Sequence, residues 1–298
     1  MASPTTPNHG KIAALYVLRP NGFDGVGLND ATWGVGSTAA DLTYYEVEID
    51  GATGSPDTFN WRVNGGAWTE DVAITGAAQT LADGQQITFA AVDGHTLGDK
   101  WTIGNLKDEP TTESTIYAQI TDATARLLNP NAPPTFTDDG GKSVIGINYT
   151  NSTATFNGNV GNVTVTGNNG YVPASALVKV GYLIDWSLSL NLDMADITAQ
   201  GDKWKTALPG HGGGSGSANG YLIASRSLYN VLKNSIEAGN KYYLLQLFNY
   251  DPDQDQTGDH ITAWATLTSF AVGDTFGGVV KETVNFQVEG EVSFTANA

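Results

Sequence analysis

The sequence predicts a mainly β protein, a sandwich or barrel with one flanking α-helix and a small additional β-domain. Val, Ile, Thr, Tyr and Trp recur in short alternating runs, which is typical of half-buried strands. The 36 glycines supply turns between them. Two stretches near the C-terminus alternate apolar and polar residues over more than twice the length of an ordinary strand.

Length and composition limit what the chain can be. Its 298 residues suffice for one large core, or one core with a small inserted domain. The formal charge of −17 is spread along the sequence, so tight duplex binding through a basic patch is excluded. The absence of cysteine excludes disulfides and thiolate metal sites. We expect no signal peptide and no membrane span, because no basic start precedes an apolar run and no apolar run is long enough.

The N-terminal half divides into a strand, an arm and a compact β-rich segment. Residues 12–18 form an apolar run that predicts a strand, and a glycine-rich arm follows it. Residues 42–106 contain several predicted strands, including a hairpin with Asn64-Gly65-Gly66 as its turn. We therefore expect 42–106 to be a small inserted β-domain within a larger domain made of 1–41 and 107–298. Residues 107–140 give mixed signals.

The first long alternating stretch follows three short predicted strands and a turn at 168–170. Its apolar positions are Tyr182, Ile184, Trp186, Leu188, Leu190, Leu192 and Met194. Its polar positions are Asp185, Ser187, Ser189, Asn191 and Asp193. Strict period two over such a length predicts a strand of roughly 40 Å with one buried face and one wetted face.

The second long stretch closes the chain. One side carries Val280, Val284, Phe286, Val288, Val292 and Phe294. The other carries Lys281, Thr283, Asn285, Gln287, Glu289, Glu291 and Ser293. Between the two long strands we expect a flexible Gly/Ser loop at 209–220, an amphipathic helix at 225–239 and two ordinary strands at 241–248 and 261–270.

These C-terminal stretches resemble the tail tube (major tail) proteins of bacteriophages with long, non-contractile tails. The resemblance rests on "GYLIDWSLSLNLDMADITAQGDKWKTALPG", the Gly/Ser loop, the helix, "LFNYDPDQDQTGDHITAWATLTSF" and "VNFQVEGEVSF". The order of elements matches that family: long strand, "T-x-x-G-D-x-W" turn, loop, helix, strand pair and long strand. It covers about residues 140–298, and 42–106 looks like an outer decoration.

The resemblance implies a structural protein of the virion tail, made in the bacterial host cytoplasm, and not an enzyme. It implies hexameric rings that stack into a tube, with four strands from each subunit in a shared inner barrel. Twenty-four strands would close at a backbone radius of roughly 26 Å, leaving a bore of roughly 40 Å. Implied partners are other copies of the chain, tail proteins at the tube ends and double-stranded DNA that passes without specific binding.

The resemblance also assigns residues. The lumen would be lined by Asp185, Ser187, Ser189, Asn191, Asp193, Thr283, Asn285, Gln287, Glu289 and Glu291, whose carboxylates repel phosphates. The Gly/Ser loop (Gly212, Gly213, Gly214, Ser215 and Gly216) would mediate contacts between stacked rings. A contractile tail, whose inner tube is built from proteins of related shape, is not distinguished from a non-contractile one.

A second hypothesis is a monomeric, calcium-stabilised β-sandwich that binds carbohydrate or a cell surface. Asp251, Asp253, Asp255 and Asp259 have the spacing of a linear calcium loop, but Gln256 stands where such loops have glycine. A solvated turn between strands is the other interpretation. Trp61, Trp68 and Trp101 would form either a sugar platform or the core of the small domain. Four scattered histidines show no metal or catalytic spacing.

Overall fold

The structure, a computed structural model, describes residues 13–18, 22–34, 42–196, 207–221, 242–248, 260–273 and 281–295. The chain is mainly β, as the alternating sequence runs predict. The described part of the chain contains strands and three-residue 3₁₀ turns but no α-helix. The helix expected at 225–239 lies outside the described residues. The strands form two compact units, which divide near residues 16 and 178.

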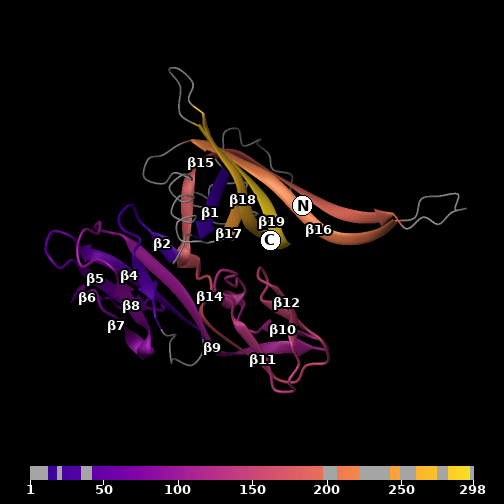
Figure 1. Cartoon of the computed structure of the whole chain (residues 1–298), viewed down its shortest axis with the longest axis horizontal. Helices are drawn as coiled ribbons and strands as arrows, with labels where there is room; N and C mark the ends of the chain where they lie inside the picture. The colour runs from indigo at the N-terminus through magenta and orange to yellow at the C-terminus, as the bar shows by residue number, and fades with distance from the viewer. Residues whose placement is uncertain are drawn as a thin grey trace, which may run out of the picture. The chain divides into compact units, whose positions relative to one another are not determined.

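The first unit, here called the barrel unit, is a closed six-stranded barrel in the order β1-β15-β16-β19-β18-β17 (Figure 1). Both predicted long strands are confirmed, because β15 has 20 residues and β19 has 15. The strands are β1 (Ala13–Leu18), β15 (Leu177–Asp196), β16 (Ala207–Tyr221), β17 (Tyr243–Phe248), β18 (His260–Gly273) and β19 (Lys281–Thr295).

Apolar side chains from alternate positions fill the barrel unit. Val284, Phe286 and Val288 of β19 are buried, while the residues between them face outward. Trp264 of β18 is also buried, which settles that this tryptophan belongs to the core. Trp186 of β15 is half-buried and donates its indole N–H to the carbonyl of Phe248 on β17, at 3.1 Å. The period-two pattern therefore corresponds to an inner and an outer face.

The predicted flexible loop at 209–220 is wrong: this segment belongs to strand β16, between β15 and β19. At Gly214 and Gly216 neighbouring atoms leave no room for a Cβ. At Gly216 a Cβ would stand 2.5 Å from Cζ of Phe286 and would also meet the carbonyl of Ser187. The Phe286 ring occupies the space that a Gly216 side chain would fill, so a glycine-rich sequence here is compatible with a paired strand.

Substitution at Gly216 tests this packing. We expect Gly216→Ala to lower the free energy of unfolding of the barrel unit by about 1–3 kcal/mol, because the added methyl overpacks against Phe286. Gly213→Ala is the matched control, since its Cβ would meet nothing closer than Nε2 of Gln287 at 4.0 Å. Hydrogen exchange of β16 and β19, measured by mass spectrometry, would report both variants. Equal protection in the two variants would contradict this account.

The second unit, here called the two-core unit, contains a ten-stranded sheet and a three-stranded sheet. The main path of the larger sheet is β12-β13-β10-β9-β4-β5-β6, and the smaller sheet is β3-β8-β7. Its strands are β2 (Phe23–Asp24), β3 (Ala31–Trp33), β4 (Thr43–Gly51), β5 (Thr58–Val63), β6 (Thr69–Ala73), β7 (Gln79–Thr80), β8 (Gln86–Phe89), β9 (Lys100–Ser114), β10 (Tyr117–Ile120), β11 (Thr135–Asp138), β12 (Val144–Asn148), β13 (Thr153–Phe156) and β14 (Val163–Tyr171).

Strand β9 links two hydrophobic cores in this unit. Its first half pairs with β4 and its second half with β10 and β14 (Figure 1). The first core gathers residues between Phe23 and Ile103 and includes Trp101. The second gathers residues between Leu106 and Tyr171. The first core draws mostly on the 42–106 segment, and residues 107–178 belong to the same compact unit. That 42–106 is an inserted domain stays a prediction.

Two local expectations are resolved here. The segment 107–140, whose signals were mixed, contains the end of β9, then β10, a 3₁₀ turn at Ala123–Ala125 and β11. The turn expected at 168–170 is wrong, because β14 runs on to Tyr171. The register of β14 with β9 shifts on both sides of Gly167, and Asn169 has φ 56°. This irregular stretch resembled a turn because Asn and Gly accept positive φ.

A buried carboxylate makes the two-core unit sensitive to acid. Glu46 of β4 is only 1% exposed and forms ion pairs with Arg62 of β5 and Lys100 of β9. Burial tends to raise the pKa of Glu46, but hydrogen bonds and charge from the two cations outweigh it and leave the pKa below its ordinary value. This stabilisation is therefore present above the unfolded-state pKa, near 4.5, and is lost as the pH falls through the lower folded-state pKa.

We expect Glu46→Gln to lower stability at pH 7 by about 2–4 kcal/mol, because two cations lose their partner. The same change should flatten the stability profile below pH 4.5, since the titrating group is gone. Urea unfolding of the full chain between pH 3 and 7 would measure both effects. Glu70→Gln, at an exposed position on β6, is the control. A variant profile parallel to that of the natural chain would contradict the role of Glu46.

Candidate functional site

The candidate site is the outward face of four neighbouring strands in the barrel unit. On β15, the side chains of Asp185, Ser187, Ser189 and Asn191 are exposed. On β19, those of Asn285, Gln287, Glu289 and Glu291 are exposed, and Thr283 is half-buried. The side chain of Asp193 lies outside the described residues. The described members of the predicted set thus share one side of the sheet, here called the polar face.

Strand β16 contributes polar residues that the sequence interpretation missed. Ser215, Ser217 and Asn219 alternate with Gly214, Gly216, Ala218 and Gly220, of which all but the half-buried Gly216 are buried. Because β16 lies between β15 and β19, these three polar side chains fill the middle of the polar face. The sequence does alternate small and polar residues here, but its high glycine content led to the prediction of a loop.

The registers align the polar residues into rows that cross the sheet. One row joins Ser187, Ser217, Asn285 and Ser269 across β15, β16, β19 and β18. The next joins Asp185, Asn219 and Thr283. A third joins Ser189, Ser215, Gln287 and Thr266. Side chains on one face of adjacent strands lie close enough to bond directly, so each row can form a hydrogen-bonded ladder.

Hydrogen bonds between side chains run along these rows. The hydroxyls of Ser187 and Ser217 are 3.0 Å apart, and the Asn285 amide donates to the Ser269 hydroxyl at 2.8 Å. In the next row, Asn219 donates to the Asp185 carboxylate and accepts from the Thr283 hydroxyl at 2.7 Å. These bonds hold the polar side chains of neighbouring strands against one another.

The charge of the polar face is acidic. Among the described residues, its carboxylates are Asp185, Glu289 and Glu291, and its cation is Lys281 at the start of β19. Glu289 accepts a hydrogen bond from the Thr266 hydroxyl at 3.2 Å. All four charged side chains are exposed. A surface of this composition repels phosphate and offers very few cations for counterion release.

The β15–β16 hairpin extends beyond the rest of the sheet (Figure 1). The pairing of β16 with β19 ends at Gly214 and Val288, whereas its pairing with β15 continues to Ala207. Among the described residues, 207–213 therefore pair with β15 alone, and Glu289 and residues 293–295 pair with β18 alone. Gly290, with φ 83°, lies just beyond the point where the strands part. Open strand edges of this kind are ready to pair with another chain.

The remaining predicted sites have different outcomes. Gly212, Gly213, Gly214, Ser215 and Gly216 form strand rather than loop, and a role in contacts between rings stays a prediction. Asp251, Asp253, Asp255 and Asp259, proposed as calcium ligands, lie outside the described residues. Within the described ranges, no group of three or more His, Asp or Glu side chains could hold a metal. In the same ranges, no helix has the length and apolarity to cross a membrane.

The three tryptophans of the first core do not form a common platform. Trp101 is fully buried and donates its indole N–H to Asn29 at 3.0 Å. Trp61 is half-buried and packs against the same core. The ring of Trp68 is covered by the Arg62 guanidinium, whose carbon lies 4.4 Å from the ring centroid. Trp101 is therefore a core residue. The three tryptophans do not form a shared surface on which a sugar ring could stack.

Comparisons with known proteins give partial structural similarities. No protein-family description and no curated protein matches the chain. A chain in the C6-symmetric tail of an empty gene transfer agent particle covers 41% of this chain and 89% of its own length, at 19% identity and a TM-score of 0.33. A chain in the virion of the native gene transfer agent covers 40% and 89%, at 19% identity and a TM-score of 0.32.

A third similarity is to a chain in the six-fold symmetrised baseplate of the anti-feeding prophage. It covers 42% of this chain and 86% of its own length, at 10% identity and a TM-score of 0.31. Each of the three similarities spans less than half of this chain. At these scores they assign no function, which has to be argued from the geometry of the polar face.

Proposed function

We propose that the chain is a structural protomer of a phage-type tail tube, and that its polar face lines a channel through which DNA passes. In this proposal six copies form a ring, rings stack into a tube, and the protein performs no chemistry. The tube belongs to a virion made in a bacterial cytoplasm, and tail proteins at the tube ends are further partners. Whether the tail contracts is left open.

One observation supports this proposal most directly. Four neighbouring strands present polar side chains on one side of the sheet, and the reverse side buries Val284, Phe286 and Val288 of β19 and Ala218 of β16. The polar side chains are joined by hydrogen bonds between strands, and the charged ones are mostly carboxylates. Two of the rows carry a polar residue on all four strands, which a face that only met solvent would not require.

The open strand edges support assembly. Among the described residues, segment 207–213 of β16 pairs with β15 and no pairing with β19 is found for it. Pairing of this edge with a neighbouring copy would continue the polar face from one subunit to the next. Six sets of four strands would then close at a radius of about 26 Å, which leaves ample room for duplex DNA.

Electron microscopy of the purified protein tests the proposal. At high protein concentration we expect six-fold rings or tubes with a central hole in negative stain. Analytical ultracentrifugation should show a concentration-dependent shift from monomer to hexamer or larger species. A chain that stays monomeric at millimolar concentration, across a range of salt and magnesium, would refute the proposal.

A further inference from the structure

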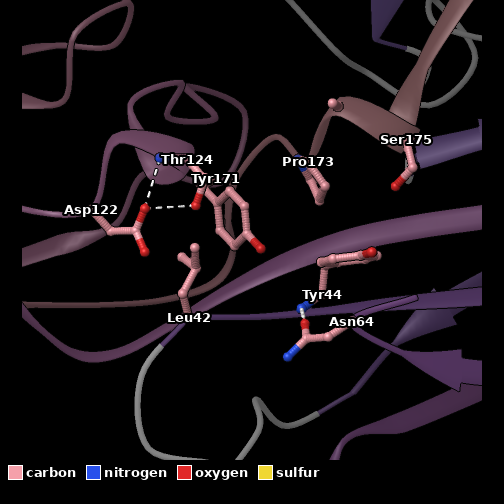
Figure 2. Close-up of a pocket in the computed structure, with 9 residues that line it drawn as sticks. Leu42, Tyr44, Asn64, Asp122, Thr124, Tyr171, Pro173 and Ser175 are labelled. Carbon is pink, nitrogen blue, oxygen red and sulfur yellow. Dashed lines mark hydrogen bonds between the residues drawn. The ribbon is translucent and has the colours of Figure 1, made fainter. Parts of the chain in front are cut away.

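The two-core unit contains a cleft of about 660 Å³ that has no role in the proposed tube. Its walls come from the start of β4, the turn after β5, the 3₁₀ turn at Ala123–Ala125 and the segment that follows β14 (Figure 2). A volume of this size is typical of sites for small molecules, in which apolar walls surround a few converging polar groups.

Tyr171 forms the floor of the cleft. Its side chain packs so closely over Gly104 of β9 that a Cβ there would lie 2.5 Å from its ring. Tyr171 is only 3% exposed, and burial raises the pKa of its hydroxyl well above the ordinary value, so this group stays a hydrogen-bond donor. Figure 2 shows the hydroxyl directed into the cleft that Tyr171 lines.

The cleft has apolar and polar walls. Leu42, Pro173 and Ala174 line its apolar part, and Asn64, Thr124 and Ser175 add polar groups. A hydroxyl that opens into such a cleft can donate a hydrogen bond to a bound ligand. Tyr44 adds a half-buried aromatic ring. Tyr44 is held in place by Asn64, which accepts from the Tyr44 N–H at 2.8 Å and donates its own N–H to the Tyr44 carbonyl at 2.9 Å.

An exposed carboxylate, that of Asp122, also lines the cleft. Asp122 accepts hydrogen bonds through Oδ1 from the backbone N–H and the hydroxyl of Thr124, both at 2.7 Å. These bonds lower the pKa of Asp122, so it is ionised at neutral pH and can only accept. In the described chain its Oδ2 makes no hydrogen bond and remains available to a ligand. The cleft thus pairs a fixed donor, Tyr171, with a fixed acceptor, Asp122.

We propose that this cleft binds an uncharged sugar ring that carries free hydroxyl groups. A pyranose has one apolar face, which suits the Tyr44 ring and the apolar walls, and hydroxyls that both donate and accept. No Lys, Arg or His lines the described cleft, so nothing there compensates an anionic ligand. The proposal is independent of the tube assembly.

The test uses the full-length chain and a panel of methyl glycosides of glucose, galactose, mannose and N-acetylglucosamine. Saturation-transfer NMR should detect at least one of them at millimolar concentration, and glucuronate should bind more weakly. Tyr171→Phe removes one hydroxyl and keeps the ring over Gly104, so we expect binding to weaken about three- to tenfold. Asp122→Asn should weaken it by a similar factor.

Tyr117→Phe is the matched control, because Tyr117 is an exposed tyrosine of β10 that does not line the cleft. It should leave sugar binding unchanged. The proposal is overturned if none of the four glycosides binds, if glucuronate binds as tightly as they do, or if both cleft variants bind like the control. Asp122→Asn keeps the proposal testable should Tyr171→Phe fail to fold.

Discussion

Replacing Glu289 and Glu291 by lysine is expected to slow DNA release from assembled tails by an order of magnitude or more. Both side chains are exposed on the polar face, so the substitutions should cost little stability. In a six-subunit ring they would change the charge of the channel wall by about +24, since each Glu→Lys adds two units. Lysines facing DNA phosphates release counterions, and the DNA would then be retained where it now slides.

The measurement is the rate of DNA release from tails that carry the variant subunit, at several salt concentrations. The variant rate should recover as salt rises, because counterion release weakens with salt. Glu70→Lys with Asp93→Lys adds the same charge at exposed positions of the two-core unit and serves as the control. Intact tails whose release rate is the same in the variant, the control and the natural chain would refute the assignment of the polar face to a DNA channel.

The second large effect concerns the folding of the two-core unit. His95→Leu is expected to destabilise this unit by about 3–5 kcal/mol, because it removes a ring hydrogen bond from each of two carboxylates and leaves them only backbone donors at residues 91 and 95. The His95 ring is fully buried and bridges Asp57 through Nδ1, at 3.0 Å, and Asp30 through Nε2, at 3.1 Å. It also meets the Phe89 ring edge-on, with centroids 5.3 Å apart. Loss of one side chain therefore disturbs both a buried polar network and the aromatic core.

Hydrogen exchange of β4 and β8 in the full-length chain would measure this effect on the two-core unit separately from the barrel. Protection in these strands should fall by a factor of one hundred or more, which is the converted lower end of the expected energy. Ser55→Ala is the control, because it removes only an exposed hydrogen bond to Asp93. Protection that falls no further in His95→Leu than in Ser55→Ala would show that the buried bridge contributes little.

The sequence was sufficient for the parts of the fold in which branched and aromatic residues alternate with polar ones. In β19, Val284, Phe286 and Val288 identify the buried face, and the polar residues between them identify the exposed one. Strand β16 was not predicted, because its buried positions are mostly glycines, which give no hydrophobic pattern. Only the position of the Phe286 ring over Gly216 explains why glycine belongs there, and that contact joins residues 70 positions apart.

Long-range contacts also explain why the extent of the two-core unit was not predicted from the sequence. Asp99 accepts hydrogen bonds from the backbone N–H groups of Val26 and Gly27, so the glycine-rich arm expected to be irregular is tied to the first core. Strand β9 crosses from that core into the next, and no break in composition marks the passage. The Tyr171 cleft could not be predicted from the sequence either, because the residues that line it come from segments far apart in the chain.

An electron cryo-microscopy reconstruction of the assembled protein tests the central claim most directly. The proposal predicts a hollow six-fold tube in which the row of Ser187, Ser217, Asn285 and Ser269 faces the axis, at a radius of about 20–26 Å. The β15–β16 hairpin and the 289–295 edge should pair with adjacent copies. An assembly in which that row faces outward, or is buried between subunits, would contradict the proposed channel.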